Sequence, residues 1–183
     1  AEAATAMMNA NPDAAAEMAA AVAEANPDAA GDVAAAMMEV NPEAAQEMAV
    51  AMLEANPEAA QGVTEALINN NPDAAAEIVA ELAVAVPEAA GEIAAGVAEA
   101  APDALSEITT AMAEANPDAA AQIAAGVAEA DPVQAAEIAV AMLEANPEAA
   151  AEIAGAVAEA IPEMAAIVTE SLLEVNPEAA TAM

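Results

Sequence analysis

The sequence contains no lysine, arginine or histidine, so its 33 aspartate and glutamate residues give a formal charge of −33 with no basic partner. Without cationic side chains the chain cannot neutralise nucleic-acid phosphates, and its own negative field repels them. The composition therefore excludes nucleic-acid binding. It also excludes ion pairs between acidic and basic side chains of the same chain.

The side chains that most enzymes use for chemistry are also missing. Cysteine, phenylalanine, tyrosine and tryptophan are absent along with histidine. The chain therefore has no nucleophile–imidazole pair, no thiolate, no Schiff-base lysine and no histidine or cysteine ligands for a metal. We expect no enzymatic activity, and no cofactor other than weakly bound calcium.

Long uncharged segments are absent too. None is longer than ten residues, the length of 119–128, which is too short to cross a bilayer, so we expect no membrane insertion. The small-residue run Ala1-Glu2-Ala3-Ala4 is typical of a mature product after signal cleavage, or of a piece of a longer chain. The first of these interpretations predicts an extracellular or cell-surface location.

Proline is the residue that organises the sequence. All twelve prolines are spaced fifteen residues apart, at positions 12, 27, 42, 57, 72, 87, 102, 117, 132, 147, 162 and 177. Such a fixed period is typical of a stacked repeat array. Counted from the residue before proline, residues 1–183 form one array, with a half repeat at 1–10, full repeats starting at 11, 26, 41, 56, 71, 86, 101, 116, 131, 146 and 161, and a half repeat at 176–183.

Each repeat carries the signals of one short helix. Asparagine at the N-cap, proline at the first helical position and an acidic residue in the first turn suit a helix start. One continuous helix is excluded, because each interior proline would cost about 3 kcal/mol. The sequence predicts a helix of about twelve residues per repeat. Val86, Ala101 and Ile161 replace the capping asparagine, at about 1 kcal/mol each, and the polar run 69–71 is the best candidate for a kink.

A helical wheel separates the acidic residues from the large apolar ones. Acidic residues occupy position three 11 times, and positions seven and fourteen 9 times each, and these positions lie within about 40° of one another. We call these three positions the acidic stripe. Positions eight and twelve hold valine, isoleucine, leucine or methionine on the opposite side. With alanine at position five and alanine or valine at position fifteen, they form a predicted apolar seam.

A single repeat cannot bury this seam by itself, so neighbouring helices must cover it. Short loops make successive helices antiparallel, which predicts an all-α fold: a two-layered α-solenoid with a 30-residue helical hairpin as its structural unit. This arrangement resembles HEAT and tetratricopeptide arrays in architecture only. Small residues at positions four and eleven, including Gly96 and Gly126, predict a close approach of helices.

The acidic stripe has two interpretations. It is either a solvated face that keeps an alanine-rich array soluble, or a row of low-affinity sites for calcium or other divalent cations, which prefer oxygen ligands. The candidate ligands are Asp13, Glu17, Glu24, Glu148, Glu152 and Glu159. Acidic residues four apart repel each other, which predicts stabilisation by divalent salt or mild acid. The eleven methionines mostly fill the predicted seam, where core packing is favoured over copper binding.

The two ends of the array show no polar capping repeat, so both should expose part of the seam. Head-to-tail contact between copies would then propagate a filament; the alternative is that the chain is an excerpt from a longer array. The candidate self-assembly residues are Met7, Met8, Val168, Leu172 and Met183.

These observations favour a non-enzymatic structural repeat protein that assembles head to tail into an acidic extracellular filament, sheath or matrix. Its expected partners are other copies of itself and divalent cations. The main alternative is a soluble polyanion that binds calcium weakly or associates with mineral. Two lesser alternatives are a solenoid that binds a basic partner and an ice-binding surface. A designed repeat protein would usually balance its charges and repeat more exactly.

Overall fold

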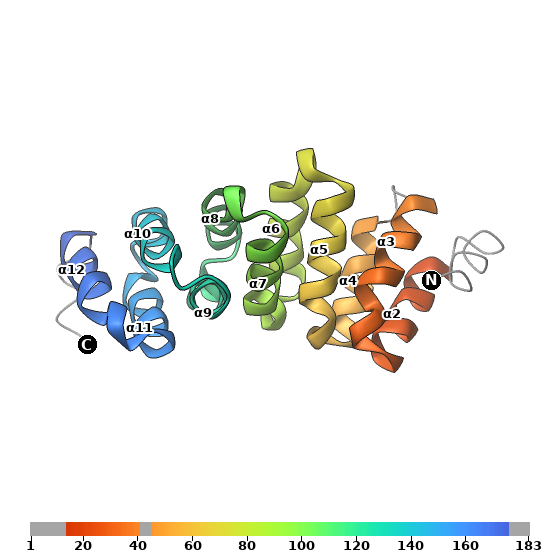
Figure 1. Cartoon of the computed structure of the whole chain (residues 1–183), viewed down its shortest axis with the longest axis horizontal. Helices are drawn as coiled ribbons and strands as arrows, with labels where there is room; N and C mark the ends of the chain where they lie inside the picture. Colours follow the sequence, from red (N-terminus) through yellow and green to blue (C-terminus); the bar gives the residue numbers. More distant parts are fainter. Residues whose placement is uncertain (1–13, 41–44, 176–183) are drawn as a thin grey trace.

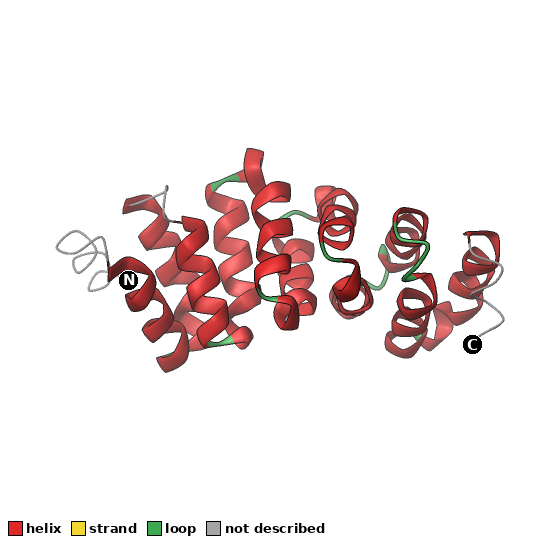
Figure 2. Cartoon of the chain, turned by 180° about the vertical axis from the view of Figure 1, so that it is seen from behind, coloured by secondary structure: helices red, strands yellow, loops and turns green. Residues whose placement is uncertain are grey.

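The computed structural model describes residues 14–40 and 45–175. In this part of the chain every regular element is helical, and no strand is present (Figure 2). The α-helices are α2 (Ala15–Ala25), α3 (Ala30–Val40), α4 (Ala45–Ala55), α5 (Ala60–Asn70), α6 (Ala75–Ala85), α7 (Ala90–Ala100), α8 (Leu105–Ala115), α9 (Ala120–Ala130), α10 (Ala135–Ala145), α11 (Ala150–Ala160) and α12 (Ala165–Val175).

Where the structure describes the proline, it comes just before its α-helix, as the repeat predicts. In most described repeats the proline opens a three-residue 3-10 turn that runs directly into an α-helix of 11 residues, as Pro27–Ala29 runs into α3. Proline suits this position because the first N–H groups of a helix have no partner within it. The prediction of one short helix per fifteen residues is confirmed.

The helices form two layers. The even layer contains α2, α4, α6, α8, α10 and α12, and the odd layer contains α3, α5, α7, α9 and α11. Most helices pack most extensively against the helix two places along the chain, in their own layer. The array is elongated, with α2 and α12 at opposite ends, and it twists: in Figure 1 α2 to α7 are seen from the side and α8 to α10 nearly end-on. The predicted two-layered α-solenoid is therefore confirmed.

The buried face of the helices differs from the predicted seam at three positions. Positions eight and twelve are buried as expected, and so is position five, but nine and thirteen join them. Position fifteen belongs to the seam only in part, because Ala25, Ala55, Ala85, Ala115 and Ala130 are exposed there, whereas Ala100 and Ala160 are half-buried against the core. Position fifteen is the last residue of each helix. On the helical wheel it lies outside the arc of positions that the neighbouring helices cover. We call positions five, eight, nine, twelve and thirteen the buried face.

The predicted capping role of asparagine is largely wrong. Among the described turns, the Asn56 side chain accepts a hydrogen bond from the Glu58 N–H at 3.1 Å, whereas Asn26, Asn71 and Asn116 make no side-chain cap. Asp131 does cap, accepting from two backbone N–H groups at 3.1 Å. Val86, expected to cost stability as a missing cap, is instead fully buried.

Two of these asparagines join neighbouring helices of the even layer. Asn56 Nδ2 donates to the Ala23 carbonyl at 3.1 Å, and Asn116 Nδ2 donates to the Ala83 carbonyl at 2.9 Å. Both acceptors occupy position thirteen, four residues before a proline. Because proline has no N–H, the carbonyl at position thirteen has no helical donor. In these two turns the amide satisfies a carbonyl that the periodic proline leaves without a partner, whereas Asn146 Nδ2, in the equivalent turn after α10, is buried without a hydrogen-bond partner.

Glycine allows the closest helix contacts, all in the odd layer. A Cβ added to Gly126 in α9 would lie 2.1 Å from the Gly91 carbonyl oxygen of α7, and one added to Gly96 would lie 2.7 Å from the Gln61 oxygen of α5. Real Cβ atoms do not approach backbone this closely, so these helices need glycine at both positions. The close approach predicted for Gly96 and Gly126 is found.

The even layer is least tightly stacked between α4 and α6, which touch only lightly compared with the other pairs in the layer. Ile78 of α6 and Val50 of α4 are only half-buried, and a hydrogen bond from Gln46 to Glu81 links the two helices. This place lies beside the polar turn at 69–71, where the sequence predicted a kink.

Candidate functional site

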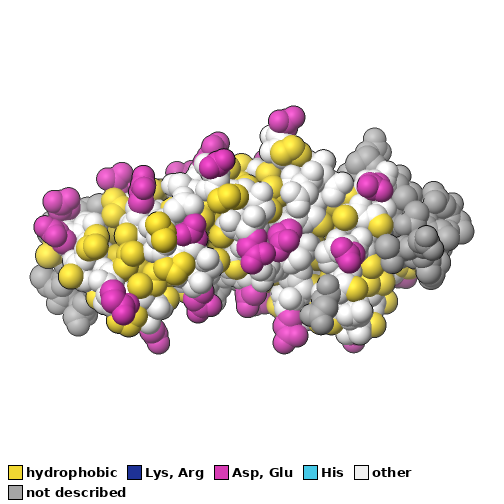
Figure 3. All heavy atoms as spheres, in the orientation of Figure 1, with side chains coloured by type: hydrophobic (Ala, Val, Ile, Leu, Met, Phe, Trp, Pro, Cys, Tyr) yellow, Lys and Arg dark blue, Asp and Glu magenta, His cyan; other side chains and the backbone are white. Residues whose placement is uncertain are grey.

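The acidic stripe lies on the outer surface of the solenoid. Among the described acidic residues only Glu65 and Asp131 are half-buried, and neither occupies a stripe position. In Figure 3 acidic side chains project from the surface, and apolar patches lie between them. The sequence has no basic side chain that could pair with them. Of the candidate cation ligands, Asp13 lies outside the described residues, and the rest are exposed: Glu17, Glu24, Glu148, Glu152 and Glu159.

Two candidate ligands share a groove in the odd layer. Glu148 and Glu152 at the start of α11 line a hollow of about 310 Å³ together with Asp118, which precedes α9. No group of three acidic residues within the described ranges is arranged to hold a metal ion. Diffuse calcium binding along the stripe thus stays a prediction.

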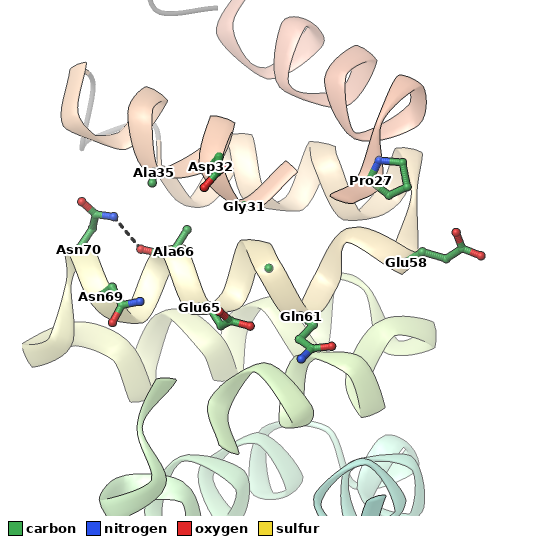
Figure 4. Close-up of a pocket in the computed structure, with 11 residues that line it drawn as sticks. Pro27, Gly31, Asp32, Ala35, Glu58, Gln61, Glu65, Ala66, Asn69 and Asn70 are labelled. Atoms are coloured by element: carbon green, nitrogen blue, oxygen red, sulfur yellow. Dashed lines mark hydrogen bonds between the residues drawn. The ribbon is translucent and has the colours of Figure 1, made fainter. Parts of the chain in front are cut away.

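A larger groove, of about 470 Å³, runs between α3 and α5. Figure 4 shows Gln61, Glu65 and Asn69 following one another along α5, with Asp32 on α3 across the groove. The Asn70 side chain, also on the groove, donates to the Ala66 carbonyl at 2.8 Å. Carboxyl and amide side chains line the groove. The sequence indicates this only through the polar residues of repeat 56–70.

Glu65 makes an unusual contact at the edge of this groove. Its pKa is raised above the ordinary value, first by burial and then by a hydrogen bond to Glu99 and by the charge of Glu99. Glu65 belongs to α5 and Glu99 to α7, so the contact bridges two neighbours in the odd layer. A proton shared between the two carboxyl groups relieves their repulsion.

We expect Glu65→Gln to stabilise the protein slightly at pH 7. Between pH 4.5, the ordinary pKa of Glu65 in the unfolded chain, and its raised pKa in the folded chain, the folded state binds more protons than the unfolded state. The free energy of unfolding therefore falls as pH rises through this window. Glutamine removes that loss, so the gain should be present at pH 7 and absent below about pH 4.5. Thermal melts across pH test this, with the exposed Glu129→Gln as a charge-matched control; a loss of stability at pH 7 would contradict it.

Exposed aliphatic side chains lie at two kinds of position. Three of them lie at stripe positions that usually hold an acidic residue: Val133 (87% exposed), Val84 (51%) and Ile167 (53%). Leu173 differs, because it belongs to the buried face and is nevertheless 51% exposed, whereas Leu143, its equivalent in α10, is 0% exposed. The buried face is therefore open at α12.

The buried face has two edges, which the first and last described helices of the even layer reveal. In α2, which has no earlier described neighbour in its layer, positions eight and twelve (Met18, Val22) are half-buried and positions five, nine and thirteen are buried. In α12 the pattern is reversed. We call positions eight and twelve the backward edge, facing the preceding helix of the layer, and positions five, nine and thirteen the forward edge, facing the next.

This rule places the predicted self-assembly residues. Val168 and Leu172 are 0% exposed because they belong to the backward edge and pack into the chain's own core. The forward edge of α12 is less covered, since Ala165 and Thr169 are half-buried and Leu173 is exposed. Met7, Met8 and Met183 lie outside the described residues. Val168 and Leu172 are thus buried within the chain, and self-assembly through the ends of the array stays a prediction.

No protein-family model matches the sequence, and comparisons with curated proteins and with solved structures give no match. Within the described ranges, every helix falls short of the length and apolar character that a bilayer crossing demands.

Proposed function

We propose that this chain is a non-enzymatic structural repeat protein that assembles end to end into an acidic filament. The observation that carries the proposal is the pair of open edges in the even layer. The backward edge is only half-buried at α2, and the forward edge is half-buried or exposed at α12. Within the chain, successive helices of the even layer pack against each other.

The acidic stripe supports growth along the axis and opposes growth sideways. Exposed carboxylates cover the outer surface, so two copies that meet side by side repel each other at short range. At the ends, the apolar edges provide a surface with few charges. The location predicted from the sequence, outside the cell or at its surface, stays a prediction.

The end contact should be weak. Burying a large aliphatic side chain contributes roughly 1.5–3 kcal/mol, and only a few are involved on each side. Association costs roughly 4 kcal/mol or more, and two chains of charge −33 repel each other. We therefore expect assembly only at high protein concentration, promoted by salt, which screens charges beyond about 8 Å at physiological ionic strength.

Electron microscopy of the concentrated chain at 0.15 M salt, with and without millimolar calcium, tests the proposal. Uniform fibres in both conditions are expected. Monodisperse monomers in both would contradict the proposal, and fibres that require calcium would favour the cation-binding alternative.

We expect Leu173→Glu to raise the critical concentration for assembly at least about tenfold, because a carboxylate would be buried in the end contact. Sedimentation at increasing protein concentration measures this value. Val133→Glu is the matched control, since it adds the same charge at a position that is 87% exposed and away from the open edges. Equal effects of the two variants would show that the open edge takes no part in assembly.

A further inference from the structure

The ends of the even layer carry hydrogen-bonding groups as well as apolar edges. The Leu173 carbonyl occupies position thirteen, and the residue four places on is Pro177, which has no N–H to donate. At the other end, Asn26 follows α2 just as Asn56 follows α4 and Asn116 follows α8. Those two amides donate to carbonyls at position thirteen, whereas the exposed Asn26 side chain has no such acceptor in the described part of the chain.

We infer, on the basis of the proposed function, that the partner of α12 is α2 of a second copy, which packs there as the next helix of the even layer. Met18 and Val22 of the second copy pack on Ala165, Thr169 and Leu173 of the first. The side-chain amide of Asn26 donates to the Leu173 carbonyl. The contact is heterologous, so it leaves the opposite edge of each copy free for another.

The register follows from the contacts within the chain. The bond from Asn56 to Ala23 places the residue after one helix beside position thirteen of the helix before it in the layer. In parallel neighbours this offset places position twelve of the later helix close to position nine of the earlier one. Val22 of the second copy therefore lies against Thr169 of the first.

Disulfide cross-linking tests this register directly, because the chain has no cysteine of its own. The double variant Thr169→Cys with Val22→Cys should form a ladder of three or more linked copies under mild oxidation. Thr109→Cys with Met142→Cys is the internal control, since it places the same two positions in α8 and α10 and should close within one chain.

Mixing the two single-cysteine variants gives a second readout. A heterologous contact predicts linked pairs that contain one copy of each variant, whereas each variant alone should stay unlinked. Linked pairs of a single variant would indicate a symmetric contact and overturn the inference. If fibres form and the internal control closes, absence of the ladder overturns this register while leaving the proposed function standing. If neither fibres nor ladder form, both fail.

The hydrogen bond from Asn26 to the Leu173 carbonyl of the neighbouring copy is tested separately, in a chain without cysteine substitutions. Asn26→Ala should raise the critical concentration roughly fivefold, the value of about one net hydrogen bond. Asn71→Ala is the control, because Asn71 precedes an even-layer helix and its side chain makes no cap. An unchanged critical concentration for Asn26→Ala would show that the amide does not cross the junction.

Discussion

Replacing Ile123 with aspartate is expected to cost at least about 4 kcal/mol of folding free energy, the largest effect of any substitution considered. Ile123 is 0% exposed at position eight of α9. The substitution removes an aliphatic side chain from the core and places a carboxylate where the sequence offers no cation to pair with it. Because solenoids gain stability from nearest-neighbour contacts, the loss should be concentrated in the helices that pack on α9.

Urea unfolding followed by circular dichroism, with hydrogen exchange to locate the loss, measures this effect. Glu129→Gln in the same helix is the control. Glu129 is exposed on the acidic stripe, so removing its charge should be neutral or slightly stabilising. A tolerated Ile123→Asp together with a damaging Glu129→Gln would mean that the two faces of the helix are assigned the wrong way round.

The glycine contacts give the second large expected effect. Gly126→Ala should destabilise the protein by about 2 kcal/mol, although alanine normally favours a helix over glycine by about 1 kcal/mol. The added Cβ would lie 2.1 Å from the Gly91 carbonyl oxygen and 2.8 Å from the Gly91 Cα, so backbone would have to move. The odd layer would be forced apart between α7 and α9.

Gly155→Ala is the matched control for this prediction. A Cβ at Gly155 in α11 meets nothing within 4 Å, so alanine should stabilise the helix by about 0.5–1 kcal/mol. Urea midpoints of the two variants should therefore shift in opposite directions. If both variants gained stability, α7 and α9 would not lie in the close contact described.

The periodic prolines made the fold predictable from the sequence. A helix start every fifteen residues and an acidic stripe opposite large aliphatic side chains leave few arrangements other than stacked short helices. The carboxylates of the stripe are exposed as expected, because nothing in the composition could compensate them in the interior. These features depend on the residues of one repeat, which the sequence displays directly.

The assignments that failed depend on contacts between repeats. Position fifteen was included in the seam because it lies near position eight on a wheel, but as the last residue of a helix it is exposed in most of the described repeats. Asparagine was expected to cap its own helix, whereas Asn56 and Asn116 reach carbonyls of an earlier one. A signal for this bond was present in the sequence, since each proline leaves the carbonyl four residues before it without a donor.

The open ends show the same limit. The sequence indicated that the array would end on apolar side chains, but a single repeat does not show which edge faces forward. Only the contrast between Leu172, buried, and Leu173, half-exposed, separates the two edges. The carboxyl contact between Glu65 and Glu99 was likewise out of reach, because it joins helices whose relative offset no repeat specifies.

Helical reconstruction of the fibres by cryo-electron microscopy would show whether the same helix stacking builds both the chain and its assembly. We predict that α2 of one copy follows α12 of the previous copy as the next helix of the even layer, in the register of Asn56 on Ala23. Fibres joined through the acidic outer faces, or with α12 against α12, would contradict it.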